Sequence, residues 1–318
     1  MKWLLTVALA AALAWSGFWA LQAWQTHAAV EDWFDQKRED GWAADYTSLQ
    51  VRGFPNRVDV TVNDLRLADP DRGLDWQAPA FQVLRLVYEP DHAILAFPPE
   101  QRLTVDGQVY DIASDGLRAS VSFARSGTLD RAGLEAEVLN IARPNGTTAL
   151  AGLRGGLAAA AGGGATYQLG LTADAAAGSG SGVGDGLALR ADVSFDAPWR
   201  RDAPSQPTPQ PTQILLDRAE YRAGGVFLRL AGELDVNPDG IPTGEVTVRA
   251  ENWRAGLDAA VAAGQLPASG ADAIGDILGL VAGPSGNPNR LDLRLRFERG
   301  QTRLGPVPIG PAPVLQLR

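Results

Sequence analysis

The stretch Val58–Leu67, which reads VDVTVNDLRL, decides the fold class. Its first valines alternate with polar residues, and a period of two is the pattern of a half-buried strand. Pairs such as Asp106-Gly107 and Asp239-Gly240 are typical of the turns that join antiparallel strands. Comparable apolar runs recur at 81–88, 93–97, 102–105, 117–123, 187–195, 226–236, 245–250 and 291–297. The sequence therefore predicts a mainly β protein made of curved, layered antiparallel sheets.

The composition of the 318 residues excludes several kinds of chemistry. Apolar residues make up 45% and charged residues 20% of the chain, as in folded globular proteins. The net charge of -9 opposes binding to nucleic acid, because the phosphate backbone is also anionic. The chain has no Cys and only 2 His, so thiol nucleophiles, disulfides and thiolate metal sites are excluded. We expect no cofactor and no metal site.

An uncharged apolar segment, Trp3–Trp24, lies near the N-terminus. As a helix with a rise of about 1.5 Å per residue, it is long enough to span the roughly 30 Å hydrocarbon core of a bilayer. Tryptophans near both of its ends suit the two headgroup zones. We therefore predict a transmembrane signal anchor over residues 1–25, built on Trp3, Leu4, Leu5, Leu13, Trp15, Phe18, Trp19 and Trp24.

A cleaved signal peptide is the alternative for this segment, since Lys2 forms a short basic region and Ala12–Ala14 is a small-x-small site. Cleavage after Ala14 would leave a soluble product that begins with an apolar run, which favours the uncleaved anchor. Lys2 adjoins the apolar segment more closely than Lys37 and Arg38 do, and this favours a cytoplasmic N-terminus. The bulk of the chain is then expected in the periplasm, outside a bacterial inner membrane that the chain crosses once.

Composition divides the rest of the chain into four segments. Residues 26–42 carry apolar side chains at helical spacing, which predicts a juxtamembrane helix that either lies on the membrane or, as we favour, caps a sheet. Residues 43–197 form a first β-rich part, with a Gly/Ala-rich loop near 150–186. The Pro-rich segment 198–213 predicts an extended connector. Residues 214–318 form a second β-rich part with two short capping helices.

The sequence contains few candidates for a catalytic site. His92 lies in a turn-like segment, and no nucleophile-elbow pattern accompanies it. Asp69 with Asp71, and Glu135 with Glu137, are pairs of carboxylates of the kind that glycosidases use. Such neighbours arise freely among 37 acidic residues, so we predict no catalytic residues.

Three motifs carry a resemblance to a known family. VRGFPNRV at Val51–Val58 leads into the first long strand, GELDV at Gly232–Val236 begins a later β segment, and LGPVPIGP at Leu304–Pro311 lies near the C-terminus. Together with the apolar N-terminal segment, they resemble the alphaproteobacterial domain-of-unknown-function family 2125. They also show a distant similarity to AsmA-like envelope proteins. The family has no assigned activity, whereas the AsmA-like similarity implies an association with phospholipid transport between membranes.

The residues that carry this resemblance are interpreted as structural. We expect Gly53 and Pro55 to shape a backbone turn that tucks Phe54 into a core. The prolines near the C-terminus interrupt ladder pairing and suit an edge segment. The motif residues are Gly53, Phe54, Pro55, Gly305, Pro306 and Gly310.

The sequence thus favours a non-enzymatic periplasmic protein that is anchored in the inner membrane. We expect the lipid bilayer to be its partner. We also expect its β-sheet to form an apolar trough that binds or passes phospholipid or another envelope lipid. A scaffold that recruits envelope proteins through a sheet edge or an exposed patch is the alternative. A carboxylate-based envelope hydrolase is less favoured.

Overall fold

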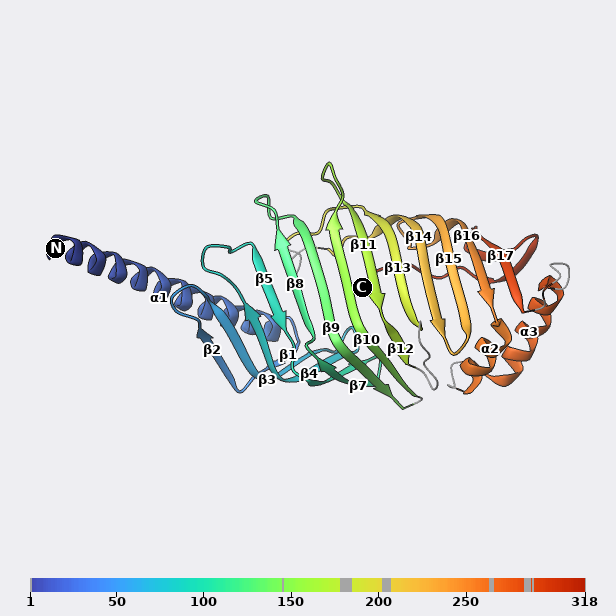
Figure 1. The fold of residues 1–318 in the computed structure, drawn as a ribbon, viewed down its shortest axis with the longest axis horizontal. Coiled ribbons are helices and arrows are strands. Elements are labelled where there is room, and N and C mark those ends of the chain that lie inside the picture. Colours follow the sequence, from blue (N-terminus) through green and yellow to red (C-terminus); the bar gives the residue numbers. More distant parts are fainter. Residues whose placement is uncertain are drawn as a thin grey trace.

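The computed structural model describes residues 2–144, 146–177, 185–201, 207–262, 266–282, 287 and 289–317. In this part of the chain one large antiparallel sheet of 19 strands accompanies three helices. The helices are α1 (Lys2–Glu39), α2 (Trp253–Ala262) and α3 (Ala268–Ala282). Figure 1 shows α1 projecting from one end of an elongated molecule, with α2 and α3 at the other end. The predicted mainly β fold with one long apolar N-terminal helix and a few short helices is confirmed.

Most strands are 5 to 15 residues long. Their bounds are β1 Ala43–Asp45, β2 Ser48–Arg52, β3 Asp59–Asp69, β4 Leu74–Leu84, β5 His92–Ala96, β6 Glu100–Val105, β7 Gln108–Asp115, β8 Arg118–Phe123, β9 Leu129–Arg143, β10 Gly146–Ala159, β11 Thr166–Ala173, β12 Ala175–Ala177, β13 Gly186–Phe195, β14 Pro211–Ala223, β15 Val226–Val236, β16 Pro242–Glu251, β17 Arg290–Glu298, β18 Gln301–Leu304 and β19 Val307–Pro311.

The helix α1 is continuous through residues 2–39, so the segment predicted as an anchor at 1–25 and most of the helix predicted at 26–42 form one helix. No glycine or proline lies between Trp24 and Glu39 to interrupt it. The helix ends where Gly41 adopts a φ of +88° and its backbone amide donates to the carbonyl of Arg38. Phe34 is buried against the first strands, so this part of the helix packs on the sheet, as favoured.

From its C-terminal edge the sheet runs in the order β19-β18-β17-β16-β15-β14-β13-β11-β10-β9. It then forks, because the first half of β9 pairs with β8 and the second half with β7. One branch continues from β8 to β5 and the other from β7 to β6, and both reach β4. The strand β4 then pairs with β3, and β3 also pairs with β1 and β2.

Two segments expected to be irregular contribute strands instead. The Gly/Ala-rich region 150–186 holds much of β10 together with β11 and β12, while residues 178–184 of the expected loop lie outside the described residues. Small side chains are accepted there because the backbone groups of β10 pair with β9 on one side and β11 on the other. Within the expected connector 198–213, residues 202–206 lie outside the described part, and β14 already begins at Pro211. Since β13 pairs directly with β14, the sheet continues past this segment.

The register of the sheet places apolar residues opposite one another on a single face, which we call the apolar face. One cross-strand row runs from β3 to β17 through Val60, Val83, Leu95, Ala119, Leu134, Gly155, Leu171, Leu189, Ala219, Leu230, Val248 and Leu293. A second row beside it contains Ala93, Val121, Ala132, Leu157, Leu169, Ala191, Leu216, Gly232, Val246 and Leu295. The apolar residues of successive strands therefore form one continuous surface.

The opposite face is polar and carries cross-strand ion pairs. Arg118 pairs with Glu135, Arg229 with Glu220, and Arg249 with Asp292. These pairs occupy the positions that alternate with the apolar rows, as the two-residue period of a strand requires. We call this surface the polar face.

Candidate functional site

The apolar face is covered by helices at its two ends. At the first end Phe34 of α1, only 3% exposed, packs with Val30 and Trp33 against Val60 and Val62. At the other end, Trp253 and Leu257 of α2 and Leu278 of α3 pack around Ala250, Leu291 and Leu293. Both contacts follow from apolar stripes on the helices.

Between these ends, the described helices leave the apolar face without a partner layer. The cluster at the centre, around Leu153 and Ala173, is built from the sheet and the Leu117 loop and contains no helix residue. Leu134 is 38% exposed, and Leu171 and Leu189 are only half-buried. Contiguous exposed apolar surface of this kind marks a site for a ligand, a membrane or a partner.

A cavity of about 680 Å³ lies where α1 meets the apolar face, and we call it the α1 cavity. Its volume is within the range of roughly 300–1,000 Å³ that is usual for small-molecule sites. The helix contributes one wall, from Gln22 to Phe34. The strands and the residue before β3 contribute mainly apolar side chains, which are Val58, Val60, Val62, Leu65, Leu67, Trp76, Phe81, Val83, Ala93 and Phe123.

The α1 cavity also contains a polar corner formed by Arg85, Asp91, Arg201 and Thr26. The Arg85 Nη2 donates a hydrogen bond of 3.2 Å to the hydroxyl of Thr26 on α1. Arg201 forms an ion pair with Asp91, and its guanidinium lies 5.1 Å from the ring centre of Phe123. Burial, together with the nearby charge of Arg201, lowers the pKa of Arg85.

The segment after β13 brings Arg201 to this corner. The backbone amide of Trp199 donates to the buried hydroxyl of Tyr167, and the carbonyl of Trp199 accepts from the Leu129 amide at 2.7 Å. The amide of Arg201 in turn donates to the carbonyl of Gly127. These bonds hold residues 199–201 across the start of β9, so the Arg201 side chain reaches the cavity from a distant part of the chain.

The turn between β2 and β3 lies beside the middle of the apolar helix. The indole nitrogen of Trp15 donates to the Pro55 carbonyl at 3.0 Å, and that of Trp19 donates to the Arg57 carbonyl at 2.7 Å. Gly53 has a φ of +114°, and an added Cβ would lie 2.7 Å from the Cβ of Arg57, so the turn requires glycine.

The expectation that Phe54 is tucked into a core is wrong, because its side chain is 56% exposed. Its ring stacks edge-on against Trp19 with a centroid distance of 5.5 Å and otherwise faces outward. The reason is the turn itself, which projects past the end of the sheet toward α1 and leaves Phe54 without a layer of residues to cover it.

The other residues singled out from the sequence fall into two groups. Of the anchor residues, Trp3, Leu4, Leu5, Leu13, Trp15, Phe18 and Trp24 are exposed, and α1 is long and apolar enough to cross a membrane. At the C-terminal end, Gly305 and Pro306 form the turn between β18 and β19, and Gly310 lies in β19. The strand β19 pairs only with β18 among the described strands, which makes it an edge.

His92, Asp69 and Glu135, which were considered for catalysis, have structural partners. The Nδ1 of His92 lies 2.8 Å from the hydroxyl of Ser122 on the neighbouring strand, a pair that the sequence analysis missed. No described carboxylate forms a hydrogen bond or ion pair with His92, so the acid of a triad is missing there. Glu135 pairs with Arg118, and Asp69 accepts the backbone amides of a turn. Among the described residues no three metal-ligating side chains come together.

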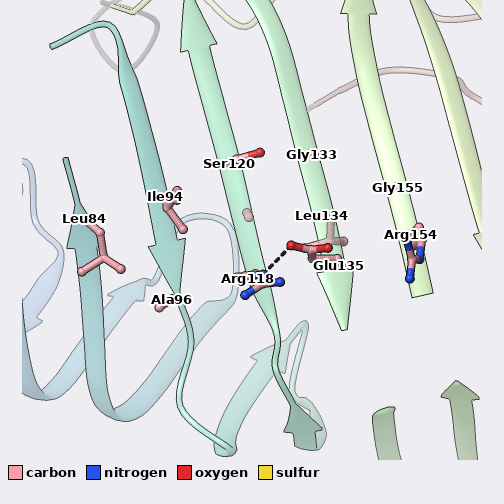
Figure 2. Close-up of a pocket in the computed structure, with 11 residues that line it drawn as sticks. Leu84, Ile94, Ala96, Arg118, Ser120, Gly133, Leu134, Glu135, Arg154 and Gly155 are labelled. Atoms are coloured by element: carbon pink, nitrogen blue, oxygen red, sulfur yellow. Dashed lines mark hydrogen bonds and ion pairs between the residues drawn. The ribbon is translucent and has the colours of Figure 1, made fainter. Parts of the chain in front are cut away.

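A second hollow, of about 520 Å³, lies over β5, β8, β9 and β10. Figure 2 shows the Arg118–Glu135 ion pair across it, with Arg154 on the next strand. Space arises because Gly133 has no side chain, and an added Cβ there would lie 2.8 Å from the Ser120 hydroxyl. Two of the three charges at this hollow are already paired with each other.

The profile of a bacterial family, described as an uncharacterized protein conserved in bacteria (DUF2125), matches residues 19–313. This match covers most of the chain, including the α1 cavity and the whole sheet. No curated protein and no solved structure matches the chain. The geometry of the apolar face and of the α1 cavity therefore carries the functional argument.

Proposed function

Because the chain belongs to the DUF2125 family of uncharacterized bacterial proteins, we propose its function from its own geometry: it is a non-enzymatic, membrane-anchored protein that holds or passes lipid along the apolar face. The helix α1 crosses the inner membrane with its N-terminus in the cytoplasm. The sheet lies in the periplasm, and lipid acyl chains pack against its apolar rows.

The observation that carries this proposal is the continuity of the apolar face from α1 to the helices α2 and α3. Its central part, around Leu134, Leu171 and Leu189, is only half-buried. Leaving apolar surface in water costs about 25 cal/mol per Å², so an acyl chain laid along the rows is stabilised by covering it. Because no polar side chain interrupts these apolar rows, a lipid acyl chain can move along them without crossing a high energy barrier.

The contacts of the N-terminal helix support entry of lipid from the bilayer. Trp15 and Trp19 are 12 and 16 residues past Trp3, or roughly 18 and 24 Å along a helix. A helix needs about 20 residues to cross the hydrocarbon core, so the turn that contacts these tryptophans would dip into the outer leaflet. The exposed Phe54 suits that position. The α1 cavity, whose helical wall begins at Gln22, would then open at the membrane surface.

The test is a photoreactive benzoylphenylalanine placed at Leu189, on the apolar face, in the full chain expressed in cells. The matched control carries it at Ala188, the next residue of the same strand, which points to the polar face. After irradiation, we expect covalent lipid adducts by mass spectrometry at position 189 and few at 188. Equal adducts at both positions, or a stoichiometric protein adduct at 189 without lipid, would overturn the proposal, and the second result would favour a scaffold.

A further inference from the structure

We propose that the polar corner of the α1 cavity is a binding site for the anionic headgroup of a lipid, with the phosphate or carboxylate held between Arg85 and Arg201. This inference rests on the proposed function and adds the class of ligand. Its occupant is an amphiphile with a negatively charged head and an apolar tail.

The polar corner has one more positive charge than its carboxylate neutralises, and this charge is available to an anionic ligand. Two guanidinium groups approach each other there, while Asp91 supplies one carboxylate, to Arg201. Arg85 forms no ion pair with any described residue, and its hydrogen bond goes to the neutral hydroxyl of Thr26. A partly buried cation without an anionic partner is unfavourable, and a phosphate or carboxylate relieves this by accepting charge-assisted hydrogen bonds.

The surroundings of the corner fit the apolar part of the same molecule. On one side, Val83 and Phe81 continue into the α1 cavity. On the other side, Phe123 lies beneath Arg201, and Ala93 belongs to the second apolar row. A tail attached to a headgroup at the two arginines can therefore lie in the cavity or extend onto the apolar face.

The corner also differs from the other places where arginines gather. Arg118, Arg229 and Arg249 on the polar face are each matched by a carboxylate on a neighbouring strand. Arg154 at the second hollow also has no carboxylate partner among the described residues, but its side chain is exposed to water, whereas Arg85 is partly buried beside the apolar wall of the α1 cavity.

The experiment measures binding of two fluorescent lipids to the full chain in a mild detergent. One is the anionic phosphatidylglycerol, and the other is an uncharged diacylglycerol with the same acyl chains. We compare the unmodified chain with Arg85→Gln, with Arg85→Lys, and with the control Arg229→Gln on the polar face. A fatty acid with the same chain distinguishes a carboxylate from a phosphate as the preferred head.

We expect Arg85→Gln to weaken binding of the anionic lipid by roughly tenfold or more, the usual effect of losing a charge-assisted hydrogen bond, and to leave diacylglycerol binding unchanged. Arg85→Lys should retain most of the preference, and Arg229→Gln all of it. If the unmodified chain binds both lipids equally and Arg85→Gln changes neither, the headgroup site is refuted while the proposed function stands. If the unmodified chain binds neither lipid, the proposed function fails with it.

Discussion

Replacing Phe34 by alanine should loosen the attachment of α1 to the sheet. Phe34 is 3% exposed, and its ring centre lies 4.7 Å from that of Tyr46 and 5.1 Å from that of Trp33. Removing a buried phenylalanine side chain typically costs about 3–5 kcal/mol, which includes the cavity that it leaves. The upper part of this range is expected here, because two aromatic contacts disappear together.

The measurement is urea denaturation of the full chain in a mild detergent, followed by the fluorescence of its tryptophans. Phe18→Ala serves as the control, because Phe18 lies on the same helix but is 44% exposed, and its ring packs against Trp15 of that helix. We expect Phe34→Ala to lower the free energy of unfolding by about 4–5 kcal/mol, and Phe18→Ala by less than about 1 kcal/mol. Equal denaturation midpoints for the two variants would refute the packing of α1 on the apolar face.

Three further predictions address the sheet and its placement. Gly232→Ala should destabilise the protein by about 1–3 kcal/mol in thermal unfolding, because the added Cβ would lie 2.7 Å from the Cα of Val246. Gly170→Ala, with no atom within 4 Å of the added Cβ, should be nearly neutral. The Arg296 guanidinium lowers the pKa of Glu245, so the stabilisation by this pair is present above the ordinary pKa near 4.5 and is lost as the pH falls through the folded value. The melting temperatures of the unmodified chain and of Arg296→Gln should therefore differ at pH 6, and the difference should shrink as the pH is lowered below 4.5. A difference that stays constant with pH would argue against the pair. An alkaline phosphatase fused after residue 318 should be active in cells, whereas activity only of a cytosolic reporter at that point would contradict the proposed orientation.

The strands that the sequence predicted are those with large alternating side chains. The runs within β3, β15, β16 and β17 show such alternation, and the structure confirms them. The strands β10 and β11 were not predicted from the sequence, because their many glycines and alanines give little difference in hydrophobicity between alternate positions. Their strand conformation depends instead on hydrogen bonds to β9 and β13. The start of β14 at Pro211 was also not predicted, because the proline-rich composition of this segment favoured a connector.

Only the general character of the candidate site could be predicted from the sequence. An apolar trough was expected, but its polar corner was not, because Arg85 and Arg201 are far apart in the chain and neither belongs to a recognisable motif. The fully paired sheet and the crossing segment at Trp199 bring them together. The closest available signal was Arg85 itself, a cation that follows an apolar run.

The sequence by itself determined the apolar N-terminal helix and the mainly β character, because both depend on patterns repeated among near neighbours in the chain. Only the tertiary structure decided that the apolar rows of distant strands join into one face and that Phe54 points outward beside Trp19. It also decided that two arginines meet under α1. These features depend on register and on contacts between distant segments, which are set by the packing of the whole sheet and have no local periodicity.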